Sequence, residues 1–379
     1  MTPPGTKRIL ILTAAFGDGH NSAARNLASA MESLGQKAKV ADPFLLAAPL
    51  TTRAICRTYR TITTRLPRLW LSIYRSTENR DFHKQYIPHK RTVELGLGRL
   101  LDEWRPDAVV STYPLHPYFL AHLFESGHRR TPVFTVITDS IEINAAWRKA
   151  PTDFWLVTDP LTRESLLRAG LPAERVAETG FPVDPAFARL APVPPDDPAD
   201  PFRILFFPTA SRSRVRRIGA ALLDAGGPHA RLTIVLGRNL RRLYRKARQL
   251  ARAHPHRVTL RGWSRRVPEM MCSHHLTVGK AGGATVHEAI AAQCPMIVHH
   301  LVPGQEEGNL ALLEQLGGGS LATTPERIAT TVRDLLADNA TAWRQSKRQL
   351  ARLGRRSGAA TAARFILDHS PPQIEPPGD

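Results

Sequence analysis

The amino-acid sequence predicts an α/β protein built from two Rossmann-like, doubly wound domains, and three observations support this. Short apolar runs alternate with helical patterns in both halves of the 379 residues. In each half, one apolar run leads directly into a glycine turn and a helix start, at 14–20 and at 280–283. A proline-dense stretch separates the halves. We therefore expect domains at 1–184 and 202–357, a linker at 185–201, and a C-terminal segment with a disordered tail at 358–379.

Composition limits the class of protein. Apolar residues make up 42% and charged residues 22%, which are globular values. The net charge of +19 and the isoelectric point near 10.8 predict attraction to nucleic acid, anionic lipid or phosphorylated substrates. Cys56, Cys272 and Cys294 lack ligand spacing, so neither a disulfide framework nor a zinc site is expected. No signal-peptide core begins the chain, and no run approaches the roughly 18 apolar residues of a membrane span. These features predict a soluble or peripheral protein.

The elements of the first half follow from apolar periodicity. Lys7–Thr13 reads as a buried strand, and Asn21 or Ser22 is expected to cap the helix after the glycine loop. Further strands are expected at 107–111, 133–137 and 154–157, with helices at 117–127 and 160–169.

The second half repeats this alternation. Strands are expected at 203–207, 232–236, 258–260, 276–279 and 295–299. Helices are expected at 238–254, 284–292, 324–338 and 341–357.

The stretch from Leu276 to Asn309 carries the strongest signal for a ligand site. Gly282 and Gly283 allow close backbone approach, and the amides of Gly283, Ala284 and Thr285 would point at an anion from a positive helix end. Glu288, one turn further, is placed to take a ribose diol. Thr285 and Glu288 also match a capping box, and Glu306 and Glu307 suit a helix start. Combined in one unit with the Pro303–Glu306 loop, these residues favour a nucleotide-sugar pocket.

The segment 51–91 mixes ten Lys and Arg with bulky apolar and aromatic residues. Such a mixture is typical of a surface that lies on an anionic membrane. It also suits RNA binding by charge and stacking, or a solvated helix over the core. The residues expected to contact a membrane are Arg57, Arg60, Arg65, Trp70 and Tyr74.

Two motifs, KAGGATVHEA followed by PGQEEGN, resemble the donor half of the diacylglycerol glycosyltransferases, which include monogalactosyl- and processive glucosyl-diacylglycerol synthases. The lipid-II-forming GlcNAc transferase is a more distant relative. The resemblance implies two domains that face each other across a cleft, the glycosyltransferase-B architecture. It assigns the diphosphate to Ala284 and Thr285, with Lys280 nearby, and the ribose to Glu288. Gln305 and Glu306 would meet the sugar hydroxyls, with Asn309 ending the motif, and Trp263 and Ser264 resemble the loop beside the uracil.

The N-terminal GDGHNSAARNL resembles the same family's Gly-x-Gly-His motif, with Gly17, Gly19 and His20 at the acceptor site. In that family the histidine is a proposed general base, a role that suits an imidazole. Asp139 ends a later strand and is expected either to orient His20 or to act as the base itself. The segment 51–91 occupies the place of the family's lipid-docking insertion. The chain differs from the family at Asn144, which replaces a histidine before Trp147. It also lacks the family's glycine turn at 208–214, where the side chains of Ser211, Ser213 and Arg214 are the candidates to substitute for it.

The resemblance implies a hexosyltransferase that moves galactose or glucose from a UDP-sugar to diacylglycerol with inversion. UDP-galactose or UDP-glucose is then a substrate, and no cofactor or metal ion is expected. The expected location is the cytoplasmic face of the cell membrane, with anionic lipids as partners. Alternatives are a polyprenyl-phosphate sugar transferase, a UDP-sugar epimerase or, in another class, a basic nucleic-acid-binding protein.

Overall fold

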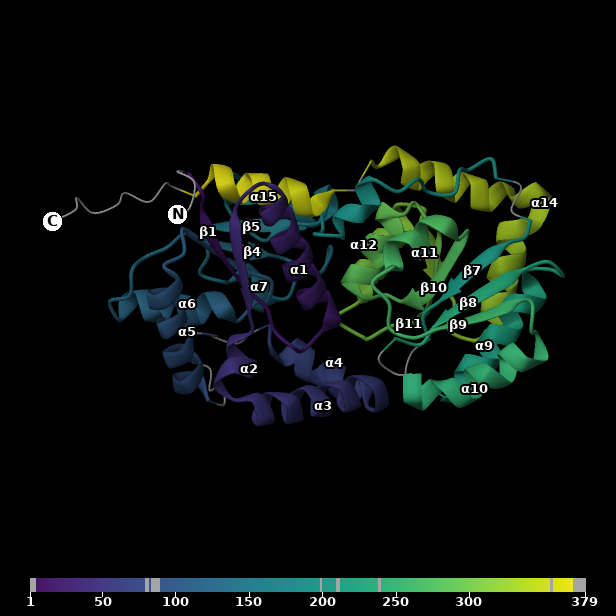
Figure 1. Ribbon diagram of the computed structural model, residues 1–379, viewed down its shortest axis with the longest axis horizontal. Coiled ribbons are helices and arrows are strands. Elements are labelled where there is room, and N and C mark those ends of the chain that lie inside the picture. The colour runs from purple at the N-terminus through teal and green to yellow at the C-terminus, as the bar shows by residue number, and fades with distance from the viewer. Residues whose placement is uncertain are drawn as a thin grey trace. The chain divides into compact units, whose positions relative to one another are not determined.

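The computed structural model describes residues 5–78, 82, 89–197, 200–208, 212–237, 240–354 and 357–370 (Figure 1). They form two compact units. The first unit takes the described residues up to Pro185, the short stretch Pro303–Gln305 and those from Ser357 onward. The second unit takes those within Ala186–Val302 and Glu306–Arg356. The predicted tail beyond residue 370 lies outside the described residues.

The first unit contains a six-stranded sheet in which every pairing is parallel. The strand order is β2-β1-β3-β4-β5-β6, so the order reverses beside β1. Ligands bind at the carboxyl ends of parallel strands next to such a reversal. The strands are β1 (Arg8–Leu12), β2 (Lys37–Ala41), β3 (Ala108–Ser111), β4 (Val133–Val136), β5 (Phe154–Val157) and β6 (Val176–Glu178).

Helices cover both faces of this sheet because side chains alternate between the faces along each strand. Ile9 and Ile11 pack with α1 and α15, whereas Leu10 and Leu12 pack with α2, α5 and α6. Figure 1 shows α15 beside α1, although the two helices begin 340 positions apart in the sequence, at 18 and 358. The helices are α1 (Asp18–Ser33), α2 (Pro43–Ala47), α3 (Pro49–Arg65), α4 (Pro67–Ser76), α5 (Lys90–Trp104), α6 (His116–Glu125), α7 (Ala145–Arg148), α8 (Pro160–Arg168) and α15 (Gly358–Asp368).

The start of α1 differs from the prediction. The helix begins at Asp18 with extended Gly17 as its N-cap, rather than after Asn21 or Ser22. Asn21 does not cap the helix because its Oδ1 accepts a hydrogen bond from Thr13 Oγ1 at 3.0 Å. His20 therefore lies in the first helical turn instead of in the preceding loop.

The second unit contains another fully parallel sheet, with the order β12-β11-β10-β7-β8-β9. Here the order reverses between β7 and β10. Its strands are β7 (Arg203–Phe206), β8 (Arg231–Val235), β9 (Val258–Arg261), β10 (Leu276–Lys280), β11 (Met296–His300) and β12 (Gly319–Leu321). Its helices are α9 (Arg212–Ala225), α10 (Leu240–Ala253), α11 (Val267–Ser273), α12 (Gly283–Ala291), α13 (Glu307–Gln315) and α14 (Pro325–Arg352).

Both units are doubly wound α/β structures, which confirms the predicted fold class. The two helices predicted near the C-terminus appear as two arms of α14, separated by non-helical backbone at 337–340. The short edge strands β2, β6 and β12 and the helix α15 were not predicted. None of the described helices has both the length and the apolar character that a membrane span requires.

A single glycine fixes how α15 joins the first unit. A Cβ on Gly358 would lie 2.1 Å from the carbonyl oxygen of Phe181 and 2.8 Å from the carbonyl carbon of Gly180. Both atoms belong to the backbone, which cannot move aside cheaply.

We therefore expect Gly358→Ala to lower the free energy of unfolding by about 2 kcal/mol or more, because the clash displaces α15 from its buried face. Chemical denaturation measures this. Gly96→Ala on α5 is the matched control, since a Cβ there meets nothing within 4 Å. The control should be neutral or stabilising by up to about 1 kcal/mol. Equal stability of Gly358→Ala and the parent would contradict the packing argument.

Candidate functional site

The reversal of strand order in the first unit places His20 at the carboxyl edge of the sheet. His20 follows β1, and Thr112 follows β3. The Thr112 hydroxyl donates to the carbonyl oxygens of Leu12 at 3.2 Å and of His20 at 3.1 Å, which ties the start of α1 to both strands. The imidazole Nδ1 lies 3.1 Å from Thr138 Oγ1 at the end of β4. The other side of the ring, with Nε2, turns toward Gly17.

Burial sets the protonation state of this imidazole. Burial lowers the pKa of His20 to about 4, against a smaller raising effect of the hydrogen bond at the Thr112 backbone. The ring is therefore neutral at physiological pH. When Nδ1 carries the proton and donates it to Thr138, Nε2 presents a lone pair, as a general base requires.

Asp139 binds the indole that lies beside His20. Its Oδ2 accepts a hydrogen bond from Trp147 Nε1 at 3.0 Å, while its neighbour Thr138 contacts Nδ1 of the imidazole. Trp147 is 2% exposed and lies with its ring centroid 6.1 Å from that of His20. The sequence predicted Asp139 beside the imidazole, and the structure adds the preceding residue, Thr138, as a hydrogen-bonding partner of its Nδ1.

Aromatic side chains that were not predicted line the same edge. Tyr113 stacks on Phe16 with centroids 5.5 Å apart and meets His20 edge-on at 5.3 Å. His116 is fully buried, with Nδ1 3.1 Å from Ser111 Oγ, and no hydrogen bond to its Nε2 is found among the described residues. Burial, with a smaller electrostatic effect of the neighbouring His20, lowers the pKa of His116 to about 3. The surroundings of His20 are therefore apolar, which suits an acceptor with a lipid body.

Asn144 caps one helix and connects it to the end of another. Its Oδ1 accepts from the backbone of Ala146 as the N-cap of α7, and its Nδ2 donates to Thr77 at 2.9 Å and to Glu78 at 2.8 Å. Glu78 also pairs with Arg148 at 2.7 Å. These bonds attach the end of α4 to the segment that carries Trp147.

On the helices α3 and α4, the predicted basic contact residues and the predicted aromatic ones differ in exposure. Arg57, Arg60 and Arg65 are exposed. Trp70 and Tyr74 are partly buried: Trp70 meets Tyr59 edge-on at 5.0 Å, and burial, with smaller effects of nearby carboxylates, raises the pKa of Tyr74. The exposed apolar residues of α4 and its N-cap are instead Leu66, Leu69 and Ile73. Of the predicted membrane-contact set, the structure thus exposes the arginines and half-buries the two aromatic residues. Residues 79–81 and 83–88 of this segment lie outside the described part.

Gln305 belongs to the first unit. Its Oε1 accepts a hydrogen bond from the Tyr59 hydroxyl at 2.7 Å. Gly304 has a φ of +78°, and a Cβ there would lie 2.7 Å from Tyr74 Cδ1. This close approach explains why a glycine precedes Gln305.

The second unit places its glycine turn where the order of its strands reverses. Gly282 is the N-cap of α12 in extended conformation, and no side chain caps this end. The structure therefore excludes the capping-box interpretation of Thr285 and Glu288, because Thr285 is the third helical residue rather than the cap. Gly282, Gly283, Ala284, Thr285 and Glu288 are all partly exposed. The amides of the first turn point at an accessible surface, which suits a phosphate.

An ion pair holds the loop beside this turn. Lys280 Nζ and Glu306 Oε1 are in contact, and the Glu306 side chain is only 5% exposed. Glu306 Oε2 accepts from the backbone of Val302 at 3.0 Å, and Asn309 Nδ2 donates to the carbonyl oxygen of Ala281 at 3.2 Å. Two residues of the predicted donor set, Glu306 and Asn309, thus fix the backbone around the glycine turn.

Other side chains of the second unit also lie at this edge, and one of them, Arg214, is a cation. The Arg214 guanidinium contacts the carbonyl oxygens of Thr323 and, at 3.4 Å, His299. His300 was not predicted, and burial, ahead of its charged neighbours, lowers its pKa. Its place directly at the end of β11 was the signal that could have found it. Trp263 is exposed, and Ser264 Oγ accepts from the backbone of Arg266 at 3.0 Å. The side chain of Ser213 lies outside the described part of the chain.

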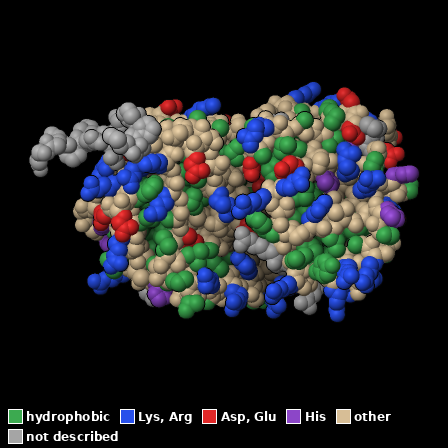
Figure 2. Space-filling view, in the orientation of Figure 1, with side chains coloured by type: hydrophobic (Ala, Val, Ile, Leu, Met, Phe, Trp, Pro, Cys, Tyr) green, Lys and Arg blue, Asp and Glu red, His purple; other side chains and the backbone are tan. Residues whose placement is uncertain are grey.

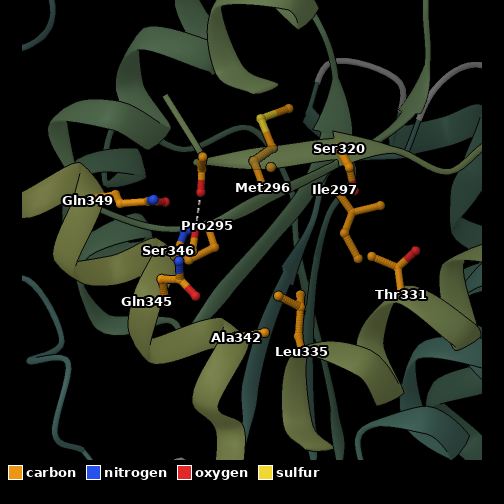
Figure 3. Close-up of a pocket in the computed structure, with 12 residues that line it drawn as sticks. Pro295, Met296, Ile297, Ser320, Thr331, Leu335, Ala342, Gln345, Ser346 and Gln349 are labelled. Atoms are coloured by element: carbon orange, nitrogen blue, oxygen red, sulfur yellow. Dashed lines mark hydrogen bonds between the residues drawn. The ribbon is translucent and has the colours of Figure 1, made fainter. Parts of the chain in front are cut away.

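A pocket of about 260 Å³ lies elsewhere in the second unit (Figure 3). Pro295 and Met296 line it from the start of β11, and Leu335, Gln345 and Gln349 line it from the two arms of α14. The glycine turn follows the carboxyl end of the parallel strand β10. The pocket is therefore at the opposite edge of the sheet and is not part of the predicted donor site.

Comparison with known proteins adds to this geometry. The family model for monogalactosyldiacylglycerol (MGDG) synthase matches residues 20–183. The processive diacylglycerol beta-glucosyltransferase of Staphylococcus carnosus is 27% identical over 345 residues, which cover 88% of this chain and 85% of that protein. The probable chloroplastic monogalactosyldiacylglycerol synthase of Nicotiana tabacum is 27% identical over 352 residues, covering 87% of this chain and 64% of that one.

The resemblance to the diacylglycerol glycosyltransferases is confirmed. Among solved structures, MurG from Acinetobacter baumannii has a TM-score of 0.59 at 16% identity, covering 96% of this chain and 99% of that one. At this identity the likeness supports the fold alone, which agrees with the glycosyltransferase-B class.

The Thr138 contact leads to a test of the first site. Thr138→Val removes the hydrogen bond to His20 Nδ1, so we expect roughly tenfold slower sugar transfer from loss of the correct tautomer and orientation. The KM for the sugar donor should not change.

Steady-state kinetics measures both values. Thr135→Val on the same strand is the control, because no hydrogen bond to the buried Thr135 hydroxyl is found among the described residues. Parent-like turnover of Thr138→Val would show that Thr138 does not position the imidazole.

Proposed function

We propose that this protein is a glycosyltransferase that moves a hexose, galactose or glucose, from a UDP-sugar onto diacylglycerol. The observation that carries the proposal is similarity to diacylglycerol glycosyltransferases along almost nine-tenths of the chain. The structure supports it with a glycine turn at the strand-order reversal of each sheet, where such folds bind ligands.

The proposed reaction uses one group from the first unit and several from the second. The acceptor hydroxyl oxygen bonds to the anomeric carbon, and its proton passes to Nε2 of His20. The bond from that carbon to the diphosphate oxygen breaks, and UDP leaves with the electron pair. Amides of Gly283, Ala284 and Thr285, assisted by Lys280, stabilise the negative charge on UDP. Glu288 binds the ribose, and attack from the opposite face inverts the anomeric centre.

An assay of purified protein with vesicles that contain diacylglycerol tests this activity. UDP-glucose, UDP-galactose and UDP-GlcNAc are supplied separately, and the lipid products are identified by mass spectrometry. We expect a monohexosyl-diacylglycerol from one of the two UDP-hexoses. Absence of any glycolipid, combined with UDP-sugar binding, would redirect the proposal to another acceptor.

The role of His20 predicts an unusual pH dependence. A base with a pKa of about 4 remains neutral as the pH falls from 8 to about 5.5. We therefore expect kcat to stay level over this range and to fall only nearer pH 4, rather than at the usual value of about 6.5. His20→Ala should lower kcat by about 100-fold or more and leave UDP affinity unchanged. An acid limb near pH 6.5, or parent-like transfer by His20→Ala, would exclude this assignment.

Diacylglycerol resides in a bilayer, so the enzyme must dock to a membrane to reach it. The exposed arginines of α3, with Leu66, Leu69 and Ile73, provide charge and apolar surface for an anionic membrane. Each basic side chain close to anionic lipid contributes about 1 kcal/mol.

We expect Arg57/Arg60/Arg65→Gln to weaken flotation on vesicles that contain phosphatidylglycerol by at least about tenfold. The control is Arg25/Arg99/Arg168→Gln, which removes three exposed arginines elsewhere in the same unit. Equal flotation of both variants would show that net charge, rather than α3, governs binding.

A further inference from the structure

The second unit has a surface of high positive charge that the proposed reaction does not use. Residues 225–268 contain twelve Lys and Arg and not one Asp or Glu. Six of these cations lie on α10. No ion pair between the six cations of α10 and a carboxylate is found in the described part of the chain, so the charge of this helix is directed toward solvent.

Most of the basic side chains of α10 lie on one side of the helix. Leu243, Ala247 and Leu250 are buried against the sheet. Arg241, Arg245, Arg248 and Arg252 are exposed, and their spacing of three, four and seven residues places them together on the opposite side of the helix. Figure 2 shows Lys and Arg side chains gathered over α10.

A row of apolar and aromatic residues runs along the edge of this basic surface. Leu240 and Tyr244 are each 42% exposed and lie one turn apart on α10. A Cβ on Gly262 would lie 3.9 Å from Leu240 Cδ2, which places the next residue, Trp263, beside the start of the helix. Trp263 is 55% exposed.

Arginines lie over both rings of the row. The Arg248 guanidinium is 5.8 Å from the centroid of Tyr244, and that of Arg265 is 5.9 Å from the centroid of Trp263. Exposed rings with guanidinium groups over them are suited to a boundary where apolar chains meet anionic headgroups. A helix that was only solvated would not need two large apolar side chains, Leu240 and Tyr244, on its exposed flank beside Trp263.

The row of apolar residues lies at the carboxyl edge of the second sheet. α10 follows the carboxyl end of β8, and Trp263 follows that of β9. Since the sheet is parallel, these ends share an edge with the glycine turn after β10. The row therefore belongs to the edge of the second unit at which the sugar donor is proposed to bind.

We propose that α10, with Leu240, Tyr244 and Trp263, is a second membrane-docking surface that binds the anionic headgroups of a phospholipid bilayer. This inference rests on the proposed function, in which the acceptor resides in a bilayer. It goes beyond that function because it assigns a lipid contact to the second unit, separate from that of α3 and α4. Arginines attract the headgroups, and the row of apolar residues enters the interface.

The test measures binding of the full chain to vesicles made of equal parts phosphatidylcholine and phosphatidylglycerol. Arg241/Arg245/Arg248→Gln should weaken binding at least about tenfold at low salt. The matched control is Arg327/Arg333/Arg352→Gln, which removes three exposed arginines from α14 of the same unit and should weaken binding less than about threefold. Leu240/Tyr244→Ser should shorten the lifetime of the bound state even at high salt, where headgroup attraction is screened.

Transfer to diacylglycerol in neutral detergent micelles separates this inference from the proposed function. The parent and both arginine variants should transfer sugar there at equal rates, since α10 is not required without anionic lipid. If the parent is active in micelles while the α10 and α14 variants bind vesicles equally, the docking surface is excluded and the function stands. If the parent is inactive in micelles, the function fails, and vesicle binding alone decides the surface. Salt-sensitive RNA binding that needs the α10 arginines, without a matching vesicle effect, would overturn the lipid assignment.

Discussion

The order of the strands in each sheet determines where the candidate chemistry lies. In a parallel sheet every strand ends at the same edge, and a reversal of the order leaves the loops on its two sides free of a crossing helix. His20 and Tyr113 follow the two strands at the reversal in the first unit, β1 and β3. The turn at Gly282 follows β10, which borders the reversal in the second unit. The residues of the first site are far apart in sequence and come together only because of this order, whereas most of those of the second site come from the single stretch 276–309.

Within that frame, hydrogen bonds determine which side chains remain available for a ligand. Thr112 and Thr138 hold His20, and Glu306 is shared between Lys280 and the backbone of Val302. Burying a carboxylate is costly unless a cation and hydrogen bonds compensate. Glu306 has both in the free protein. In the proposed donor site, a sugar hydroxyl would therefore meet a carboxylate that is already fixed in place, so little ordering would be needed when the donor binds.

The sequence was sufficient for the alternation of elements and for the two glycine turns, because apolar periodicity and glycine position depend on local chemistry. It was insufficient where tertiary contacts decide. Asn21 looked like a helix cap, but Thr13 binds its side chain. Thr285 and Glu288 matched a capping box, but the helix starts two residues before Thr285. Trp70 and Tyr74 were predicted to contact a membrane, but they pack with neighbouring aromatic residues and are half-buried, and leucines are exposed instead. No local pattern could show that α15 returns to the first unit.

The positions of the charged residues in the structure, rather than the net charge, indicate which kind of ligand the chain attracts. A net charge of +19 by itself is compatible with nucleic acid, lipid or a phosphorylated substrate. The described cations are not spread evenly: α3 and α10 both expose arginines beside large apolar side chains, whereas Arg333 of α14 lies 3.6 Å from Asp224. Nucleic acid is held by phosphate contacts and by stacking on aromatic rings, and it has no use for exposed leucine and isoleucine. Leu66, Leu69 and Ile73 beside the basic helix of the first unit, and Leu240 in the second, therefore favour a lipid interface over a nucleic-acid one.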